Sequence, residues 1–272
     1  MIFPKISVVT ISYAHEKYII DTIEGIMMQE YPGEIEFILA NDNSPDRSDE
    51  IIKKYLQENK IPINITVCYT KHTENKGMMR NFEWALNQAT GKYIAICEGD
   101  DYWTDPLKLR KQVSFMEANP DFTMCFHKVD ITMSDENDFF SYKLPDSDIL
   151  YLNDIVKNHY IPTCSLVYRN HMFPNGFPNW FSSSISGDIP LEVLLASKGK
   201  TKYLTDVMAC YRRNNGGISK SPKQIAKTRA GYISMYNNLA NEIEFKSASH
   251  LRYLAFRLKL GYIKVFLKKL LS

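Results

Sequence analysis

Segments with the pattern of a strand and segments with the pattern of a helix alternate along the first part of the chain. Continuous apolar and β-branched runs, typical of buried strands, lie at residues 6–12, 35–40, 63–69 and 93–97. Between them, apolar residues recur at helical spacing over residues 15–29, 46–58 and 78–90. This alternation predicts an α/β fold of the Rossmann type, a mostly parallel sheet with helices on both faces.

Polar residues follow three of these strands at the point where each strand ends. They are Ser12 and Tyr13 after the first strand, the Asn-Asp-Asn-Ser sequence at 41–44, and the Glu-Gly-Asp-Asp sequence at 98–101. Ligands bind at the carboxyl ends of the strands in such sheets. We therefore expect these three clusters, distant in sequence, to lie close together.

The sequence Glu98-Gly99-Asp100-Asp101 places three carboxylates within four residues at the end of an apolar run. Burying unpaired charge is costly, and neighbouring carboxylates repel one another unless a cation lies among them. Mg²⁺ or Mn²⁺ would be satisfied by one or two of these groups, with phosphate oxygens and water completing the shell. An acidic turn bent at Gly99 is the alternative, and the motif alone does not decide between the two.

The second half of the chain has a less regular pattern. A helix capped by Thr104 or Asp105 should run from Pro106 to about Ala118. Beyond it the sequence predicts strands at 121–133, 163–169 and 202–211, a helix at 189–197, an irregular segment at 135–148, and helices at 222–245 and 250–271. We expect one large domain over residues 1–220 and a helical C-terminal segment at 221–272.

The composition is typical of a soluble globular protein, with 44% hydrophobic and 24% charged residues. A net charge of +2 argues against a nucleic-acid-binding protein. No apolar run is long enough to span a bilayer, and the N-terminus lacks the pattern of a signal peptide. Five dispersed cysteines, without the spacing of a metal site, indicate reduced thiols. These features predict a cytoplasmic protein.

Six stretches of the chain, in the same order, resemble the nucleotide-sugar glycosyltransferases of family 2, which have the GT-A fold. They are ISVVTISYAHEKYIIDTI, IEFILANDNSPDRSDEII, NKGMMRN, GKYIAICEGDDYWTDPLKL, SGDIPLEVLLASKGK and YRRNNGGIS, and they span roughly residues 5–220. Each motif is weak alone, and six in register are strong. The resemblance implies a GT-A-like catalytic domain, with a nucleotide-binding half at about 1–105 and an acceptor half at about 106–220.

The resemblance assigns five residues to the donor nucleotide, namely Tyr13, Asp42, Lys76, Arg80 and Glu98, with UDP as the expected nucleotide. Tyr13 would stack on the base, and Asp42 would accept a hydrogen bond from it. A half-buried core tyrosine and an Asx turn are the alternative interpretations of these two residues. Lys76 and Arg80, beside the loop and helix start at 75–81, would complement the diphosphate charge, or would form a solvated basic face.

The same resemblance identifies the acidic quartet with the family's DXD motif. Glu98 replaces the first Asp and would face the ribose or the metal's water shell, while Asp100 would be the direct ligand of Mn²⁺ or Mg²⁺. Asp101 would be a second ligand or would hold the turn. Asn214 stands where many relatives have a metal-ligating histidine, and its amide oxygen suits Mg²⁺ better than Mn²⁺. Arg212 would clamp the leaving diphosphate, or form surface ion pairs.

Asp188, after Gly187 and before a predicted helix, matches the family's catalytic acid residue. A sugar hydroxyl that attacks the anomeric carbon needs a carboxylate to take its proton, whereas helix capping is the alternative role. The resemblance thus implies inverting transfer of a sugar to a glycan or lipid-linked acceptor, in bacterial surface-polysaccharide synthesis. A sugar-nucleotidyltransferase and a non-catalytic sugar-nucleotide-binding protein are the alternatives.

The C-terminal segment has no acidic residue after Glu244 but has seven lysines and arginines. On a helical projection, Lys246, Arg257, Lys264 and Lys268 fall on one stripe, away from most of the apolar residues. Such a helix can lie on an anionic membrane at the cytoplasmic face, or it can pack on the catalytic domain with its lysines in water. The pattern leaves these two interpretations open.

Overall fold

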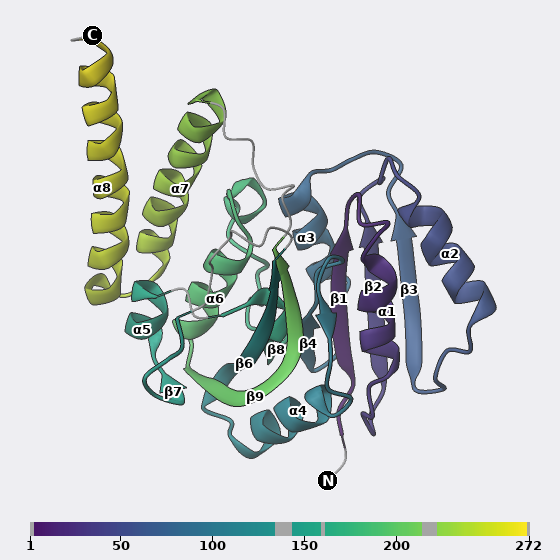
Figure 1. Cartoon of the computed structure of the whole chain (residues 1–272). Helices are drawn as coiled ribbons and strands as arrows, with labels where there is room; N and C mark the ends of the chain where they lie inside the picture. Colours follow the sequence, from purple (N-terminus) through teal and green to yellow (C-terminus); the bar gives the residue numbers. More distant parts are fainter. Residues whose placement is uncertain (1–2, 134–142, 159–160, 214–221, 271–272) are drawn as a thin grey trace.

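In the computed structural model, which describes residues 3–133, 143–158, 161–213 and 222–270, a nine-stranded mixed sheet forms the centre of the molecule (Figure 1). The strand order is β3-β2-β1-β4-β8-β6-β9-β5, and β7 pairs with β9. The strands are β1 (Ile6–Ser12), β2 (Ile35–Asn41), β3 (Ile65–Lys71), β4 (Tyr93–Ile96), β5 (Tyr102–Trp103), β6 (Phe122–Met133), β7 (Ile149–Leu150), β8 (Val167–Arg169) and β9 (Lys200–Arg213).

Helices cover both faces of the sheet, as the alternating pattern predicts (Figure 1). On one face lie α1 (Ile19–Met27), α2 (Ser48–Glu58) and α4 (Lys108–Ala118). On the other lie α3 (Met78–Asn87), α5 (Leu152–Lys157), α6 (Asp188–Ala196), α7 (Pro222–Glu242) and α8 (Phe245–Leu270). Short 3₁₀ turns occur at Thr163–Ser165 and Phe181–Ser183.

The buried positions explain why these segments fold as they do. Ile19, Ile23 and Ile26 of α1 are spaced three or four residues apart, and all three are fully buried against the sheet. Strand β2 is buried at every position because it lies between β1 and β3 and is covered on both faces. Continuous apolar runs of this kind were the basis for predicting the strands.

The predicted parallel pairing holds for one part of the sheet. β1 pairs in parallel with β2 and β4, β2 with β3, and β6 with β9. β8 is antiparallel to both β4 and β6, and β5 and β7 are antiparallel to β9. The sheet is therefore mixed, with its antiparallel strands in the half that the sequence indicates to be irregular.

The strand order places a crevice beside β1. The chain runs from β1 out to β2 and β3, and then returns to form β4 on the opposite side of β1. The helical connections on either side of β1 therefore separate, and the carboxyl ends of β1, β2 and β4 border an open space.

The C-terminal helices α7 and α8 run side by side at the end of the molecule opposite α2 (Figure 1). Leu239 of α7 and Leu251 of α8 belong to the same buried cluster as Leu191 of α6, so the hairpin shares a core with the rest of the fold. Among the described residues, no helix combines the length and apolar character needed to span a bilayer. The predicted division at residue 220 falls outside the described residues.

Candidate active site

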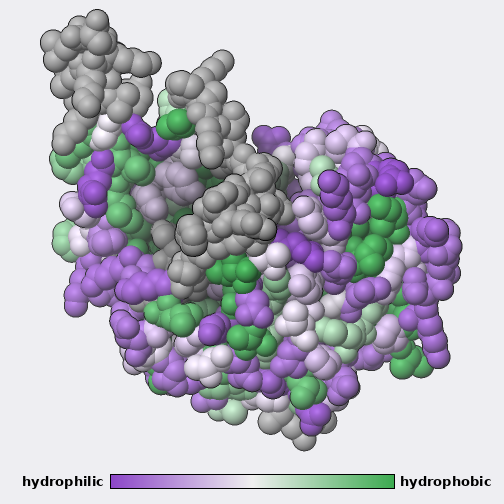
Figure 2. All heavy atoms as spheres, viewed as in Figure 1, coloured by the Kyte–Doolittle hydropathy of each residue, from purple (hydrophilic) through white to green (hydrophobic). Residues whose placement is uncertain are grey.

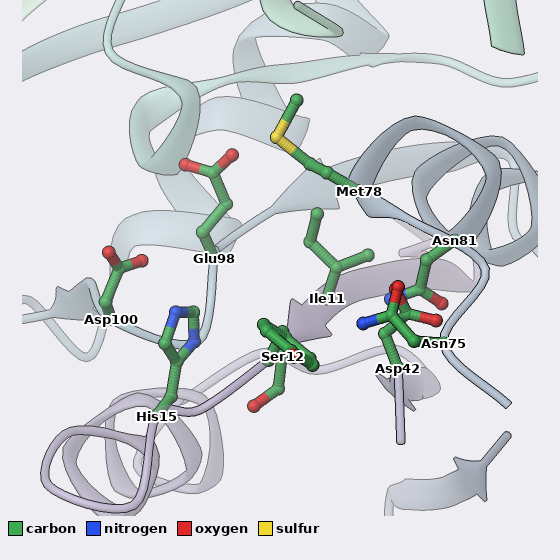
Figure 3. A pocket seen from close by; sticks show the side chains of 10 residues that line it. Ile11, Ser12, His15, Asp42, Asn75, Met78, Asn81, Glu98 and Asp100 are labelled. Carbon is green, nitrogen blue, oxygen red and sulfur yellow. The ribbon is translucent and has the colours of Figure 1, made fainter. Parts of the chain in front are cut away.

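A cavity of about 430 Å³ opens at the carboxyl ends of β1, β2 and β4 (Figure 3). Residues from all three predicted polar clusters contribute to its lining. This confirms the prediction that the three clusters lie close together. The lining residues are Ile11, Ser12, Tyr13, His15, Asp42, Asn75, Met78, Asn81, Glu98 and Asp100. Four of these, Tyr13, Asp42, Glu98 and Asp100, are site residues that the sequence analysis named.

Asp42 fixes the loop that leads into α3. Its two carboxylate oxygens accept hydrogen bonds from the backbone N–H groups of Lys76 (2.7 Å) and Gly77 (2.9 Å). Gly77 has a φ of 84°, a left-handed conformation that glycine adopts without strain. A carboxylate has about four acceptor sites, so the Asp42 carboxylate retains capacity for a ligand in the cavity. The predicted turn at this position is formed instead by Asn41, whose Oδ1 accepts the Ser44 N–H at 2.8 Å.

The acidic turn that follows β4 divides its carboxylates between two environments. The side chains of Glu98 and Asp100 line the cavity, and in Figure 3 Asp100 lies beside His15 whereas Glu98 extends away from it. Asp101 is 1% exposed, and its Oδ1 accepts the backbone N–H of Arg212 at 2.8 Å. Its Oδ2 is buried and has no hydrogen-bond partner. This geometry matches the turn-holding role that the sequence left open for Asp101.

Burial and mutual proximity disfavour the charged forms of the carboxylates at this turn. Burial raises the pKa of Asp101, the nearby Asp100 raises it further, and the Arg212 N–H opposes both, leaving a value of about 8. Burial also raises the pKa of Glu98 well above its usual range, and the neighbouring carboxylates of Asp100, Asp101 and Asp188 add to the effect. A cation at this turn would relieve the repulsion.

The donor set fits a hard divalent ion held by few protein ligands. Glu98 and Asp100 offer carboxylate oxygens to the cavity, and such oxygens suit Mg²⁺ or Mn²⁺. Over the described part of the chain, no three His, Cys, Asp or Glu side chains are grouped to hold a metal. Diphosphate and water oxygens would complete the shell of an ion held by these carboxylates. Asn214, the predicted third ligand, lies outside the described residues.

Arg212 reaches the acidic turn from β9. Its Nη1 donates to the backbone carbonyl of Asp100 at 3.2 Å, its Nη2 pairs with Asp21, and its guanidinium lies 4.2 Å from the centre of the Tyr102 ring. Together with the backbone bond to Asp101, these contacts tie the turn to β9 and α1. The two side-chain hydrogen bonds use two of the five N–H donors of the guanidinium, and the diphosphate-clamping role stays a prediction.

A second cavity of about 360 Å³ adjoins the first and contains Asp188. Asp188 is the first residue of α6, and its Oδ1 accepts a hydrogen bond from the Ser186 hydroxyl. The residues that line this second cavity are Ile11, Met78, Met79, Phe82, Glu98, Thr163, Ile185, Ser186, Gly187, Asp188, Tyr211 and Tyr232. Ile11, Met78 and Glu98 line both cavities, so the acidic turn borders the cavity of Asp188 through Glu98.

Two predicted residues lie apart from this arrangement. Lys76 and Arg80 are exposed and line neither cavity, although the backbone of Lys76 contacts Asp42. The diphosphate contacts assigned to their side chains therefore stay predictions.

Sequence reasoning missed His15, Asn75 and Asn81, which line the first cavity. The Nδ1 of His15 is buried without a hydrogen-bond partner, and burial lowers the pKa of the ring while Asp100 and Asp46 oppose that shift. The position of His15, three residues beyond the end of β1, was the signal that could have identified it. Asn81 was obscured because it lies inside a helix, where its amide bonds the Ala40 carbonyl at 3.1 Å.

Residues 7–172 match the family model described as Glycosyl transferase family 2. The chain belongs to glycosyltransferase family 2. This confirms the predicted family.

Two relatives and two solved structures are similar to this family 2 chain. It is 35% identical over 213 residues to the uncharacterized protein Rv1520 of Mycobacterium tuberculosis, covering 78% of this chain but only 60% of that protein. It is 30% identical over 227 residues to TuaG of Bacillus subtilis, a putative teichuronic acid biosynthesis glycosyltransferase, covering 82% of this chain and 85% of TuaG.

The structural neighbours confirm the predicted GT-A-like fold. S. aureus TarS 1–349 in complex with UDP-GlcNAc matches with a TM-score of 0.70 at 17% identity, covering 95% of this chain and 73% of TarS 1–349. The mannosyltransferase PcManGT of Pyrobaculum calidifontis, in complex with GDP-Man and Mn²⁺, matches with a TM-score of 0.64 at 16% identity, covering 96% of this chain and 74% of that one.

Proposed function

We propose that this family 2 protein is an inverting, metal-dependent glycosyltransferase that moves a sugar from a nucleotide-sugar to an acceptor hydroxyl. The observation that carries the proposal is the pair of adjoining cavities. One contains Asp42 and Asp100, the other contains Asp188, and Glu98 lines both. A donor in the first cavity and an acceptor in the second would meet beside Glu98.

The first cavity suits the nucleotide diphosphate of the donor. The ring of Tyr13 is half exposed at its entrance, where it offers a face for stacking on a base. Asp42 offers acceptor capacity to a ring N–H such as that of uracil. The choice of uracil rests on the family resemblance and on TarS, which was solved in complex with UDP-GlcNAc. Mn²⁺ or Mg²⁺ held by Asp100 would neutralise the charge that builds up on the departing diphosphate.

The second cavity suits the acceptor and its deprotonation. Asp188 would take the proton of the attacking hydroxyl as that oxygen forms its bond to the anomeric carbon. The Ser186 hydroxyl, bonded to Oδ1 of Asp188, holds the carboxylate in one orientation. Attack from the Asp188 side, with the diphosphate leaving from the side of Asp100, inverts the anomeric configuration.

We further propose a glycan or lipid-linked acceptor in bacterial surface-polysaccharide synthesis, with the enzyme at work in the cytoplasm. The similarity to TuaG, whose name refers to teichuronic acid biosynthesis, supports this class of acceptor.

The test is nucleotide release from a panel of UDP-, GDP- and TDP-sugars with Mn²⁺, Mg²⁺ or EDTA, alongside calorimetric binding of the free nucleotides. Asp188→Asn should lower turnover by about 10²–10⁴-fold while nucleotide binding is retained. Asp100→Asn should weaken metal-dependent nucleotide binding as well. The matched control is Asp121→Asn, because the Asp121 carboxylate is exposed and lines neither cavity.

Each outcome has a defined meaning for the proposal. Full turnover in Asp188→Asn would exclude it as the base. Nucleotide binding without release in the wild type, even with glycan acceptors present, would favour a non-catalytic nucleotide-binding protein. Release of pyrophosphate from a nucleoside triphosphate and a sugar phosphate would instead identify a nucleotidyltransferase.

A further inference from the structure

Helix α8 has one apolar face that packs on the protein. Ala248, Leu251 and Ala255 are buried, and they belong to the core cluster that includes Met235 and Leu239 of α7. Spaced three or four residues apart, they define the inner face of the helix. Through this face α8 packs on α7, in a buried cluster that also contains Leu191 of α6.

A second apolar stripe on α8 faces away from the protein. Phe245 is 81% exposed, Tyr253 53%, Phe256 55% and Leu260 41%. At about 100° per residue these four side chains fall within an arc of about 80°, opposite the inner face. We call this stripe the outer face. Figure 2 shows apolar residues at the surface over α8, interleaved with hydrophilic ones.

Cationic side chains border the outer face along both edges. Arg252 and Lys259 lie along one edge and Lys246 and Arg257 along the other, and all four are exposed. We call these four residues the basic rim. The guanidinium carbon of Arg257 lies 5.9 Å from the centre of the Tyr253 ring, so cation and aromatic ring occupy one surface. The sequence has no acidic residue beyond Glu244.

Two side chains of the outer face carry a polar group, Ser249 and Tyr253. Ser249 is exposed on this stripe, but its hydroxyl donates to the Lys246 carbonyl of the same helix at 2.7 Å. The backbone groups of the helix interior bond to one another. Within the face only the Tyr253 hydroxyl would then need a partner, and at the boundary between headgroups and acyl chains a tyrosine hydroxyl reaches polar headgroups and water.

We propose that the outer face of α8 binds an anionic lipid surface, with α8 lying parallel to that surface. The aromatic stripe would enter the boundary between headgroups and acyl chains, and the basic rim would contact lipid phosphates. A second copy of the chain fits less well, because a symmetric contact through this face would bring two basic rims together.

Through α7, the outer face is linked to the second cavity. Tyr232 of α7 lines that cavity, while Met235 and Leu239 of the same helix belong to the cluster that contains the inner face of α8. If the proposed function holds, this link would position the enzyme beside acceptors anchored in the same lipid surface.

The test is co-sedimentation of the full chain with vesicles of phosphatidylcholine, alone or mixed with phosphatidylglycerol. Because no donor or acceptor is present, this measurement is independent of glycosyl transfer. The outer-face variant carries Tyr253→Ser, Phe256→Ser and Leu260→Ser. The rim variant carries Lys246→Gln, Arg257→Gln and Lys259→Gln, and leaves in place Arg252, which donates to the Ala240 carbonyl of α7. The controls are Ile63→Ser, at a fully exposed apolar position, and the charge-matched Lys53→Gln, Lys54→Gln, Lys60→Gln variant.

We expect the wild type to bind the mixed vesicles and to bind phosphatidylcholine alone at least about tenfold more weakly. Both α8 variants should lose about tenfold or more in partition coefficient, while both controls retain binding. Raising the salt from about 0.1 to about 1 M shortens the screening length from about 10 to about 3 Å and should weaken wild-type binding.

Three results would overturn the proposal. The first is that the outer-face variant binds the mixed vesicles as strongly as the wild type does. The second is that vesicle binding by the wild type does not depend on phosphatidylglycerol. The third is a dimer in analytical ultracentrifugation that the outer-face variant converts to a monomer, since the face would then be a contact between copies. Circular dichroism of each variant checks that the fold is retained.

Discussion

Arg212, beside the acidic turn, could act as a clamp for the diphosphate or as a side chain that holds the turn in place. The Arg212→Met variant distinguishes these two roles. A diphosphate clamp would act on the donor alone. The structure instead shows Arg212 bonded to the Asp100 carbonyl and to Asp21, with its guanidinium on the Tyr102 ring. We predict that this side chain chiefly holds the turn in place. Its loss will therefore lower the free energy of unfolding and increase the metal concentration needed for half-maximal donor hydrolysis.

The contacts give a magnitude for the loss. A hydrogen bond from a charged donor contributes about 1.5–3 kcal/mol, and Nη1 makes one to the Asp100 carbonyl. The cation–π contact with Tyr102 adds about 0.5–1 kcal/mol. The Asp21 pair adds less than about 1 kcal/mol because Asp21 is half exposed. Since such contributions are not additive, we expect Arg212→Met to cost about 2–4 kcal/mol.

Urea unfolding measures the stability, and donor hydrolysis against metal concentration measures the effect on the turn. Arg212→Lys keeps the charge but has no planar fork to bridge several acceptors, so it should recover only part of the loss. Arg110→Met, on the exposed side of α4, should change stability by less than about 0.5 kcal/mol. A raised KM for the donor at saturating metal, with stability unchanged, would refute the turn-holding role and support the clamp.

Three further predictions concern single sites. Burial would raise the pKa of Glu36, but hydrogen bonds from Ser7, Thr90 and Lys5 lower it to about 2. Its contribution is therefore present at neutral pH and is lost as the pH falls toward 2, so Glu36→Gln should cost about 1–3 kcal/mol in urea unfolding at pH 7 and progressively less in acid. An equal cost at every pH would contradict this. At Gly99, an added Cβ would lie 2.7 Å from Nδ1 of His15 and 3.1 Å from the Ile11 carbonyl oxygen. Gly99→Ala should weaken calorimetric UDP binding about tenfold, with partial recovery on adding His15→Ala, and unchanged binding would show that the turn adapts. Because the pKa of Asp101 is raised to about 8, the stability it contributes in acid is lost as the pH rises through that value. Without divalent ions the melting temperature should fall between about pH 4 and 8, and Mn²⁺ or Mg²⁺ should reduce that fall, whereas identical profiles with and without metal would argue against an ion at the turn.

The sequence predicted the parallel half of the sheet closely because burial there produces an unmistakable pattern. The strand expected at 35–40 is Ile35–Asn41, and that expected at 93–97 is Tyr93–Ile96. By contrast, β5 (Tyr102–Trp103) and β7 (Ile149–Leu150) were missed. Each has only two residues, and each exists because β9, far away in sequence, offers it a partner. No local pattern can indicate such pairing.

The candidate site shows the same limit at the level of side chains. Strand ends identified where Asp42, Glu98 and Asp100 would gather, because parallel topology brings those ends to one edge of the sheet. The direction of each side chain depends on contacts that the topology does not specify. Asp101 faces the interior because the Arg212 N–H, 111 residues further along the chain, meets its carboxylate. A motif therefore locates a site more reliably than it assigns the residues within it.

Helix α8 shows what packing adds to a helical pattern. The sequence has enough apolar residues for two faces, and periodicity does not decide which face will be buried. The structure buries Ala248 and Ala255 and leaves Phe245 and Phe256 in water, although a phenylalanine gains far more from burial than an alanine. Small inner residues allow α8 to approach α7 closely, which explains the alanines but not the exposed aromatic rings. A stripe of large apolar side chains at the surface, bordered by cations on both edges, is expected where a further apolar and anionic surface completes the burial.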